Sequence, residues 1–305
     1  MHPVLSFPAL EGMQYPRLQY RGLLRFVQGL DDIISLPGVT RAEVRVLMTS
    51  ASRGCTRETA TALPNLRLVI SQGAGQEKID ITYLAERGIR LRSIAEALTD
   101  DVADLAMALT HMLCRRLIRA DAFARSGEWE KGRFGLGESV VSMTMGIAGL
   151  SGRIGQAIAR RAVASRMNIA GLDRPSNQRL EVPLYSGWRA LAEASDVLML
   201  VVPGSPDLRH VVNVEVLSAL GPKGWLINVG RASILDTDAL IHALEERVIA
   251  GAALDVLETE PHVPPRLAAL SNVILTPHIG AQTRGQRARA ACIAEDEVMA
   301  FLGEA

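Results

Sequence analysis

The sequence predicts an α/β protein with two lobes, and three observations lead to that fold class. Short apolar segments alternate with helical segments along most of the 305 residues. The strand-like segments are apolar on both faces, as is typical of buried parallel strands. The alternation stops at a polar stretch, residues 126–139, and resumes at residue 143. Ligands of such folds bind beyond the carboxyl ends of the strands, so we expect a cleft between the lobes.

The first half carries three clear strand patterns. They cover residues 44–50, 66–71 and 89–93. A long helix is expected from about residue 100 to 124, with Thr99 as its N-cap and two aspartates in its first turn. The stretch 126–139 has the composition of a loop and carries one aromatic residue, Trp129, which either packs locally or docks against a second subunit.

The second half repeats the alternation with more strands. They are expected at residues 144–149, 167–173, 196–203, 224–230, 251–256 and 272–278. A helix follows the first of them, another is led by Asp236, and a last helix covers roughly 284–303. The first lobe has few helices and strands of its own for an α/β domain. The last helix would complete this lobe if the chain crossed back to it.

Composition narrows the functional class. Lys plus Arg equals Asp plus Glu, 33 against 33, and no basic stripe is present, so nucleic acid is not an expected partner. Cys55, Cys114 and Cys292 are odd in number and widely spaced, which argues against a disulfide framework and a structural zinc site. No signal peptide and no membrane span are expected, so the predicted location is the cytoplasm.

A glycine cluster follows the strand at 144–149. It contains Gly149, Gly152 and Gly155 and has the spacing G-x-x-G-x-x-G, one residue longer than a dinucleotide-binding turn. Asp173 ends the next strand, eighteen residues after Gly155, where an acidic residue would bind ribose hydroxyls. The alternative is a plain strand–helix–strand connection with an exposed aspartate. A bulged turn that still receives a pyrophosphate at the helix start is the favoured interpretation.

Arg174, next to Asp173, leaves the choice of coenzyme open. The aspartate would repel the 2′-phosphate of NADP, whereas the arginine would bind it, stack on adenine or lie in solvent. NAD is favoured and NADP remains an alternative.

Three charged residues stand just past apolar strands of the second half. They are Arg231, Glu260 and His278. Taken singly, the arginine could cap a helix or pair with Asp236, the glutamate could be a solvated turn residue, and the histidine could be a buried structural one. Together they suit reduction of a 2-oxo acid: a histidine protonates the carbonyl oxygen, a carboxylate orients the ring, and an arginine binds the substrate carboxylate.

A second glycine-rich turn, Gly73-Ala74-Gly75, ends a strand of the first half. Its closely spaced amides could form a nest for a carboxylate. It could equally be an ordinary tight turn between a strand and a helix.

The ordered set of motifs resembles the D-isomer-specific 2-hydroxyacid dehydrogenase family, and most closely its hydroxypyruvate/glyoxylate and hydroxyphenylpyruvate reductases. The matching segments, from about residue 42 to 303, are LPNLRLVISQGAGQEKID, LTDDVADLAMAL, GRIGQAIARR, GPKGWLINVGRASILD, GAALDVLETEP and NVILTPHIGA. The resemblance implies two Rossmann-like, doubly wound domains and a homodimer. The substrate domain would combine 1–97 with 282–305, and the dinucleotide-binding domain would be 98–281.

The resemblance also implies roles for individual residues. Arg231, Glu260 and His278 would be catalytic, and the amides of Ala74 and Gly75 would hold the substrate carboxylate. The implied coenzyme site contains Gly152, Arg153, Ile154, Gly155, Asp173, Arg174, Val202, Pro203, Val229, Asp255 and Gly280.

The chain departs from the family in its long glycine turn and in Gln76-Glu77, where many relatives have an aromatic residue or threonine after the second glycine. Two other functions therefore stay open: a nicotinamide-sensing corepressor-like scaffold, and a family member with impaired cofactor binding.

Overall fold

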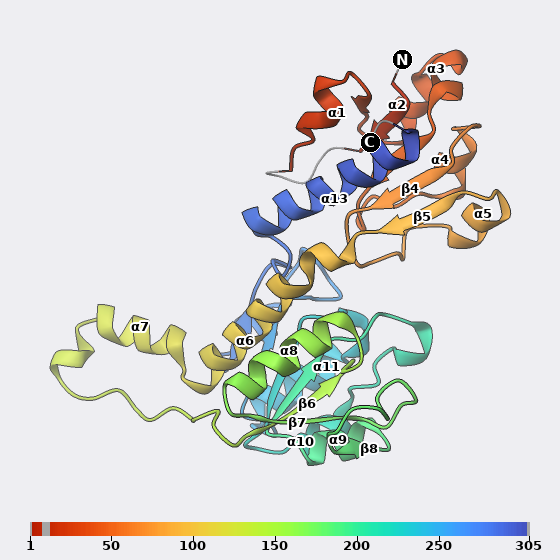
Figure 1. Ribbon diagram of the computed structural model, residues 1–305. Coiled ribbons are helices and arrows are strands. Elements are labelled where there is room, and N and C mark those ends of the chain that lie inside the picture. Colours follow the sequence, from red (N-terminus) through yellow and green to blue (C-terminus); the bar gives the residue numbers. More distant parts are fainter. Residues whose placement is uncertain (1, 8–12, 304–305) are drawn as a thin grey trace. The chain divides into compact units, whose positions relative to one another are not determined.

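The computed structural model describes residues 2–7 and 13–303, and it divides into two compact units (Figure 1). The first unit is Met1–Leu98 with Gln282–Ala305, and the second is Thr99–Ala281. Each unit contains one fully parallel sheet with helices, which confirms the predicted α/β class with two parallel-sheet domains.

The sheet of the first unit has five parallel strands in the order β2-β1-β3-β4-β5. The strands are β1 (Val4–Ser6), β2 (Leu24–Phe26), β3 (Val46–Thr49), β4 (Leu68–Ser71) and β5 (Arg90–Ser93). Numbered along the chain this order is 2-1-3-4-5, a doubly wound arrangement whose direction reverses beside β1. Strands β3, β4 and β5 were correctly predicted from the sequence, whereas the short strands β1 and β2 were not expected.

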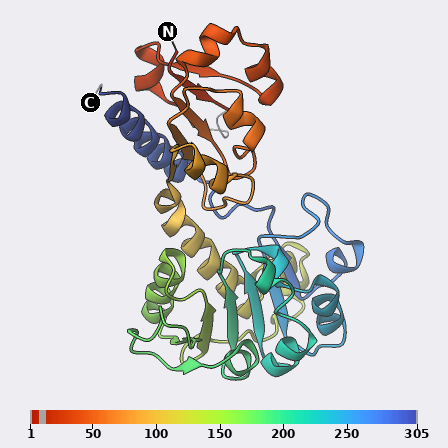
Figure 2. The same cartoon turned by 90° about the vertical axis from the view of Figure 1, so that its right-hand side faces the viewer.

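Helices cover both faces of this sheet. They are α1 (Pro16–Tyr20), α2 (Leu30–Ser35), α3 (Gly38–Glu43), α4 (Arg57–Thr61), α5 (Ile81–Glu86), the 3-10 helix η1 (Ala95–Leu98) and α13 (Arg284–Leu302). The closing helix α13 packs Ala290, Ala294 and Val298 against one face of this sheet (Figure 2). Glu295 of α13 is buried and accepts the backbone amides of Arg17 and Leu18 at 2.8 and 3.1 Å, which holds α1 in place.

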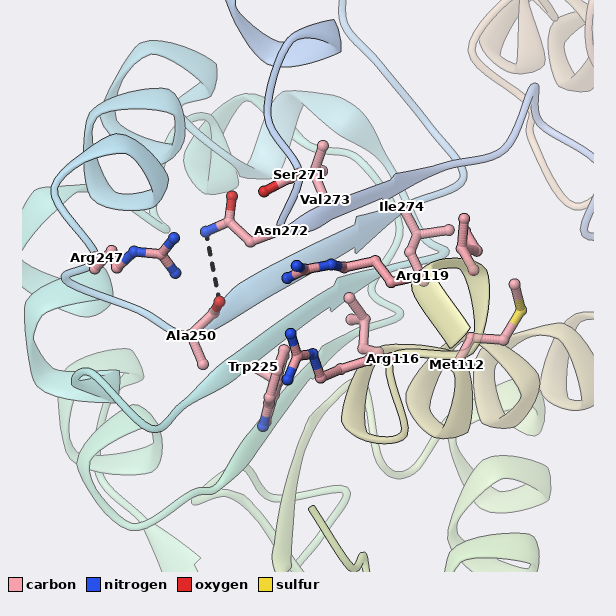
Figure 3. A pocket seen from close by; sticks show the side chains of 12 residues that line it. Met112, Arg116, Arg119, Trp225, Arg247, Ala250, Ser271, Asn272, Val273 and Ile274 are labelled. Carbon is pink, nitrogen blue, oxygen red and sulfur yellow. Dashed lines mark hydrogen bonds between the residues drawn. The ribbon is translucent and has the colours of Figure 1, made fainter. Parts of the chain in front are cut away.

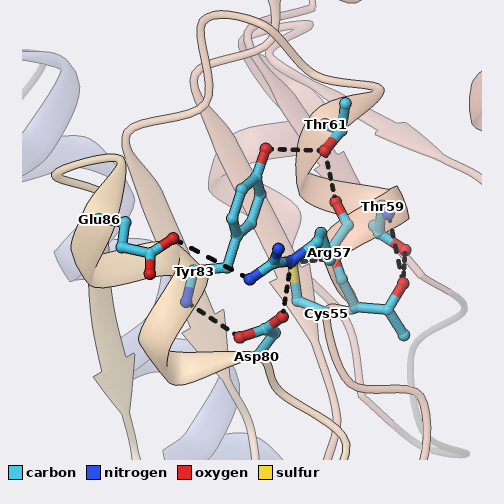
Figure 4. Close-up of polar contacts among 8 residues, drawn as sticks. Cys55, Arg57, Thr59, Thr61, Asp80, Tyr83 and Glu86 are labelled. Carbon is cyan, nitrogen blue, oxygen red and sulfur yellow. Dashed lines mark hydrogen bonds and ion pairs between the residues drawn. The ribbon is translucent and has the colours of Figure 1, made fainter.

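A polar cluster joins α4 to α5 on the other side of the first unit (Figure 4). Arg57 lies over the ring of Tyr83 at 4.6 Å from its centroid and pairs with Asp80 at 3.3 Å. Asp80 is also the N-cap of α5 and accepts the amide of Tyr83 at 2.9 Å. Since these side chains provide one another's hydrogen-bond and ion-pair partners, the cluster stabilises the packing of α4 against α5.

The sheet of the second unit has seven parallel strands in the order β12-β11-β10-β9-β6-β7-β8. The strands are β6 (Thr144–Ala148), β7 (Asn168–Leu172), β8 (Leu184–Tyr185), β9 (Val197–Leu200), β10 (Trp225–Asn228), β11 (Gly251–Leu254) and β12 (Val273–Leu275). Counted within the unit this is 3-2-1-4-5-6 with one further strand, the Rossmann order. The direction of winding reverses between β6 and β9, where such folds bind dinucleotides.

The helices of the second unit lie on both faces of its sheet. They are α6 (Thr99–Cys114), α7 (Leu117–Arg125), α8 (Arg153–Ala164), α9 (Trp188–Glu193), α10 (Val214–Leu220), α11 (Thr237–Glu245) and α12 (Pro265–Ala268), with 3-10 turns η2 (Glu128–Glu130), η3 (Pro206–Leu208) and η4 (Ala232–Ile234). Helices α6 and α8 lie side by side (Figure 1), and α9, α10 and α11 share one apolar core. As predicted, Asp236 caps α11 through the amide of Ala239 at 3.0 Å.

The long helix expected over 100–124 is interrupted, so that prediction is wrong. Arg116 adopts a left-handed conformation, φ 54°, which ends α6 and starts α7 in a new direction. Thr99 is the first residue of α6 and not its N-cap, because η1 leads directly into that helix. No helix among the described residues is both long and apolar enough to span a bilayer.

Candidate active site

Charged residues of the second unit gather past the carboxyl ends of three neighbouring strands. Arg231 follows β10, Asp255 follows β11, and His278 follows β12. Because parallel strands end at the same edge of their sheet, these residues belong to one edge, as the sequence predicts.

His278 and Glu260 form the central contact of this edge. The Nδ1 atom of His278 lies 3.0 Å from Oε2 of Glu260. A carboxylate only accepts hydrogen bonds, so Nδ1 is the donor of this pair and the ring tautomer is defined by its partner. The other oxygen of Glu260, Oε1, accepts the amide of Leu257 at 2.8 Å, which orients the carboxylate. His278 also has a positive φ of 55°, an uncommon conformation that only a well-supported segment sustains.

Asp255 supports the backbone segment that carries His278. It is 2% exposed, and its Oδ1 accepts the hydroxyl of Thr276 at 2.6 Å and the amide of Ile279 at 2.8 Å. Its Oδ2 accepts the amide of Gly280 at 2.9 Å. The buried carboxylate thus binds both sides of the segment that carries His278. The family resemblance implied a coenzyme-binding role for Asp255, and this structural contribution was not predicted.

Asn228 plays a comparable part for Arg231 and was also missed. Its buried amide donates to the carbonyl of Arg231 at 3.1 Å and accepts the amide of Gly230 at 3.0 Å. The guanidinium of Arg231 donates to the carbonyl of Gly230 at 3.0 Å. A polar residue in the last, wholly buried position of an apolar strand is the signal that could have identified Asn228.

A cavity of about 250 Å³ lies against this edge. Asp255, Glu260 and His278 all line it, together with apolar side chains including Leu257, Val263 and Leu275. The structure therefore brings three of the predicted site residues to one cavity. Arg231 is not part of its lining.

The glycine turn after β6 is a tight loop followed by an open helix start. Gly149 has φ 101°, and its carbonyl accepts the amide of Gly152 at 3.0 Å. A side chain on Gly155 would overlap that same carbonyl oxygen, so only glycine fits there. Helix α8 begins at Arg153 after Gly152, and no side chain caps it. The first-turn amides, including that of Ile154, have no acceptor within the helix and can bind an anion.

The segment after β7 is polar and faces solvent. Asp173 and Arg174 are exposed, and the buried Asn177 holds the loop by donating to the carbonyl of Leu172 at 2.8 Å. Ser151, in the lengthened glycine turn, donates to the hydroxyl of Ser176 at 2.9 Å. The additional residue therefore ties the glycine turn to the loop after β7.

The other predicted coenzyme residues lie around the same edge. Val202 and Pro203 follow β9, and Val229 follows β10 with its amide bound to the carbonyl of Leu200 at 3.2 Å. A side chain on Gly280 would come within 3.1 Å of Asp255, so the backbone is closely packed there.

The Gly73-Ala74-Gly75 turn belongs to the first unit, directly after β4 and Gln72. The carbonyl of Gly73 accepts the hydroxyl of Ser93 at 3.0 Å. Gly75 is buried and Ala74 is exposed.

A second cavity of the second unit, of about 320 Å³, lies where the strands of its sheet begin (Figure 3). Trp225 and Val273, which begin β10 and β12, line it together with Arg116, Arg119 and Arg247. These strands start at this cavity, and Arg231 and His278 follow their other ends, so the cavity is separate from the edge that carries those two residues.

A Rossmann strand order, a glycine-rich helix start at its reversal point and a histidine–carboxylate pair at the strand ends together define an NAD(P)-dependent oxidoreductase. Comparison with known proteins specifies the class further. The profile of the D-isomer specific 2-hydroxyacid dehydrogenase NAD-binding domain matches residues 107–280, and the chain belongs to that family, as its motifs indicate.

Characterised relatives include glyoxylate/hydroxypyruvate reductase A of Arabidopsis thaliana, 42% identical over 261 residues, which cover 86% of this chain and 83% of that protein. Glyoxylate reductase of Pyrococcus horikoshii is 39% identical and covers 85% of this chain and 80% of its own length. Among solved structures, the NADPH-dependent glyoxylate/hydroxypyruvate reductase of Sinorhizobium meliloti has a TM-score of 0.86 and 35% identity, over 99% of this chain and 94% of that one.

Proposed function

We propose that this chain reduces a small 2-oxo acid of the glyoxylate or hydroxypyruvate type to the D-2-hydroxy acid, with NAD(P)H as reductant. The observation that carries the proposal is the His278–Glu260 contact of 3.0 Å beside a cavity at the carboxyl edge of a Rossmann sheet. The relatives that are named as glyoxylate and hydroxypyruvate reductases support this choice of substrate class.

His278 serves as the general acid in this proposal. Its Nδ1–H is engaged by Glu260, so Nε2 is the ring nitrogen that delivers the proton to the carbonyl oxygen. Glu260 keeps the ring in this orientation by accepting its Nδ1–H. In the reverse direction the same nitrogen accepts the hydroxyl proton.

Arg231 binds the carboxylate and carbonyl oxygens of the substrate, since a guanidinium matches a carboxylate with two parallel hydrogen bonds. The closely spaced amides of Ala74 and Gly75, in the first unit, are proposed as a carboxylate-binding turn. Charge developing on the carbonyl oxygen is then balanced by Arg231 and His278.

The coenzyme fits the residues of the second unit. The uncapped start of α8 suits a pyrophosphate on the amides of Arg153 and Ile154, and the glycine at position 155 leaves the backbone accessible. Asp173 is proposed to bind the ribose hydroxyls, while Val202, Pro203 and Val229 line the ring-binding surfaces near Asp255 and Gly280. When bound, the reduced nicotinamide supplies the hydride.

The preferred coenzyme depends on Asp173 and Arg174, which are both exposed after β7. NADH is favoured because a carboxylate at this position repels a 2′-phosphate. Arg174 supplies the charge that would accept NADPH, the coenzyme of the Sinorhizobium enzyme.

The direct test measures NADH and NADPH oxidation with glyoxylate, hydroxypyruvate, phenylpyruvate and pyruvate, followed by chiral analysis of the product. We expect turnover that is highest with glyoxylate or hydroxypyruvate, and a D-configured product from hydroxypyruvate. An absence of turnover with all four acids and both coenzymes would contradict the proposal.

The protein is further proposed to be a homodimer in the cytoplasm with no nucleic acid partner. Helix α7 and the following segment expose large apolar side chains, of which Ile118 also lines the arginine-lined cavity of Figure 3. These are Leu117, Ile118, Trp129 and Leu136, with Leu136 94% exposed. A second copy covering this face would remove them from water. Light scattering of the purified chain tests this directly, and a monomer at micromolar concentration would contradict it.

A further inference from the structure

A second histidine–glutamate contact lies two residues away from the catalytic one. Glu258 is in the same turn as Glu260, between β11 and α12. Both of its oxygens lie 3.1 Å from Nε2 of His210, and Oε1 also accepts Nη1 of Arg209 at 2.9 Å. Its side chain is 24% exposed, so the carboxylate is largely enclosed by these partners.

The partners of Glu258 come from a different strand end. Arg209 and His210 follow η3 in the loop after β9. His210 has a positive φ of 52°, and its amide donates to the carbonyl of Ser233 at 2.8 Å, next to Arg231. The contact therefore joins the segments that follow β9, β10 and β11.

We propose that Arg209, His210 and Glu258, here called the Glu258 clasp, position the turn that carries Glu260 and thereby orient His278 for catalysis. The proposal rests on the proposed function. The two glutamates of this turn face opposite ways: Glu258 binds the loop after β9, and Glu260 binds His278 after β12.

The backbone of the turn explains why such an anchor matters. Within residues 257–262, the amide of Glu260 donates to the carbonyl of Leu257 at 3.3 Å, and the amide of His262 donates to the carbonyl of Thr259 at 2.7 Å. These bonds are all local and close the turn on itself. The clasp is the side-chain contact that connects the turn to the β9 loop. Catalysis is sensitive to displacements of about 1 Å, so an anchor outside the reacting groups affects the rate.

The first experiment compares Arg209→Gln, His210→Ala and Glu258→Gln with the parent protein. We expect each to lower kcat about tenfold while the KM for NADH stays within about twofold, because the clasp acts on the catalytic turn and not on the coenzyme site. Glu245→Gln is the matched control, since it removes an exposed ion pair with Arg266 in the same unit and should leave kcat unchanged.

His210→Gln provides the conservative rescue. Its amide can donate to Glu258, and it meets the same positive φ as alanine does, so the two variants differ in the side-chain contact alone. We expect glutamine to recover most of the kcat that alanine loses. Equal losses in both variants would overturn the proposal.

A double variant tests whether the clasp acts through Glu260. If it does, Glu258→Gln adds no further loss of kcat once Glu260→Gln is present. Independent, multiplying losses would overturn the proposal.

A readout without turnover separates the clasp from the proposed function. Hydrogen–deuterium exchange of a peptide covering 253–262 reports the amide of Leu257, which is bound to Glu260. We expect faster exchange there in the three clasp variants and no change in Glu245→Gln. Unchanged exchange would overturn the clasp, whereas a parent protein that reduces no 2-oxo acid but exchanges as expected would overturn the proposed function alone.

Discussion

The side chain of Asp255 holds the segment around His278, with its carboxylate bound to the amides of Ile279 and Gly280 after it and to the hydroxyl of Thr276 before it. A buried carboxylate with three donors constrains a segment far more than the local sequence does. This contact, together with Glu260, places the imidazole at the carboxyl edge of the sheet.

Replacing His278 by alanine should abolish most of the activity and spare the binding of NADH. We expect kcat to fall by about 10²- to 10⁴-fold, the usual contribution of a positioned general acid. Steady-state kinetics and NADH fluorescence measure the two effects. His242→Ala, which removes an exposed histidine of α11, is the control and should behave like the parent. If the alanine variant at His278 turned over at the parental rate, the role of the imidazole would be refuted.

Replacing Gly155 by alanine should weaken coenzyme binding. The added methyl group overlaps the carbonyl of Gly149, so the glycine turn must shift away from the start of α8. We expect NADH affinity to drop about tenfold or more, which corresponds to about 1.4 kcal/mol. Gly187→Ala is the control, because nothing lies within 4 Å of its new methyl group. Equal fluorescence titrations for both variants would contradict the placement of the pyrophosphate, and no binding by the parent would favour the alternative of impaired cofactor binding.

Exchanging Asp173 for serine should shift the protein toward NADPH. Removing the carboxylate relieves its repulsion of the 2′-phosphate and leaves Arg174 to bind it. We expect the ratio of kcat/KM for NADPH over NADH to rise about tenfold, since one charge contact of this kind is worth roughly 1.5 kcal/mol. Arg174→Gln should change the ratio in the opposite direction. If neither substitution alters this ratio, the adenosine ribose does not bind beside Asp173 and Arg174.

The buried thiols should make the protein less stable in alkali. Burial, with a smaller contribution from Asp80, raises the pKa of Cys55 to about 12, and burial with Glu138 raises the pKa of Cys114 to about 11. Thiols of the unfolded chain ionise near about 8.5. Above that pH the unfolded state holds fewer protons than the folded state, so the free energy of unfolding falls as the pH rises, until the folded thiols also ionise.

Urea unfolding at pH 8 and pH 10 measures this loss of stability, and Cys55→Ala should reduce it. In the folded protein only the exposed Cys292 should react quickly with a thiol reagent at pH 8. Fast reaction of all three thiols would show that Cys55 and Cys114 are accessible.

The sequence by itself determined much of the framework. Apolar strands such as β4 and β9 are buried on both faces, so their pattern is local and could be recognised in the chain. The spacing from Gly155 to Asp173 likewise follows from one strand–helix–strand unit. The order of the motifs was sufficient to indicate the family.

Tertiary structure decided those features of the fold and the site that depend on one residue's conformation or on contacts between residues far apart in the chain. The break at Arg116 rests on one left-handed residue within a helical pattern, and β1 and β2 are too short to stand out in the sequence. The contacts of Asp255, Asn228 and Glu258 join different strand ends and loops, which chain spacing does not reveal. The sequence therefore predicted candidate groups for the chemistry, while long-range packing decided which groups hold them in place, because a side chain's partners are chosen by the fold and not by its neighbours along the chain.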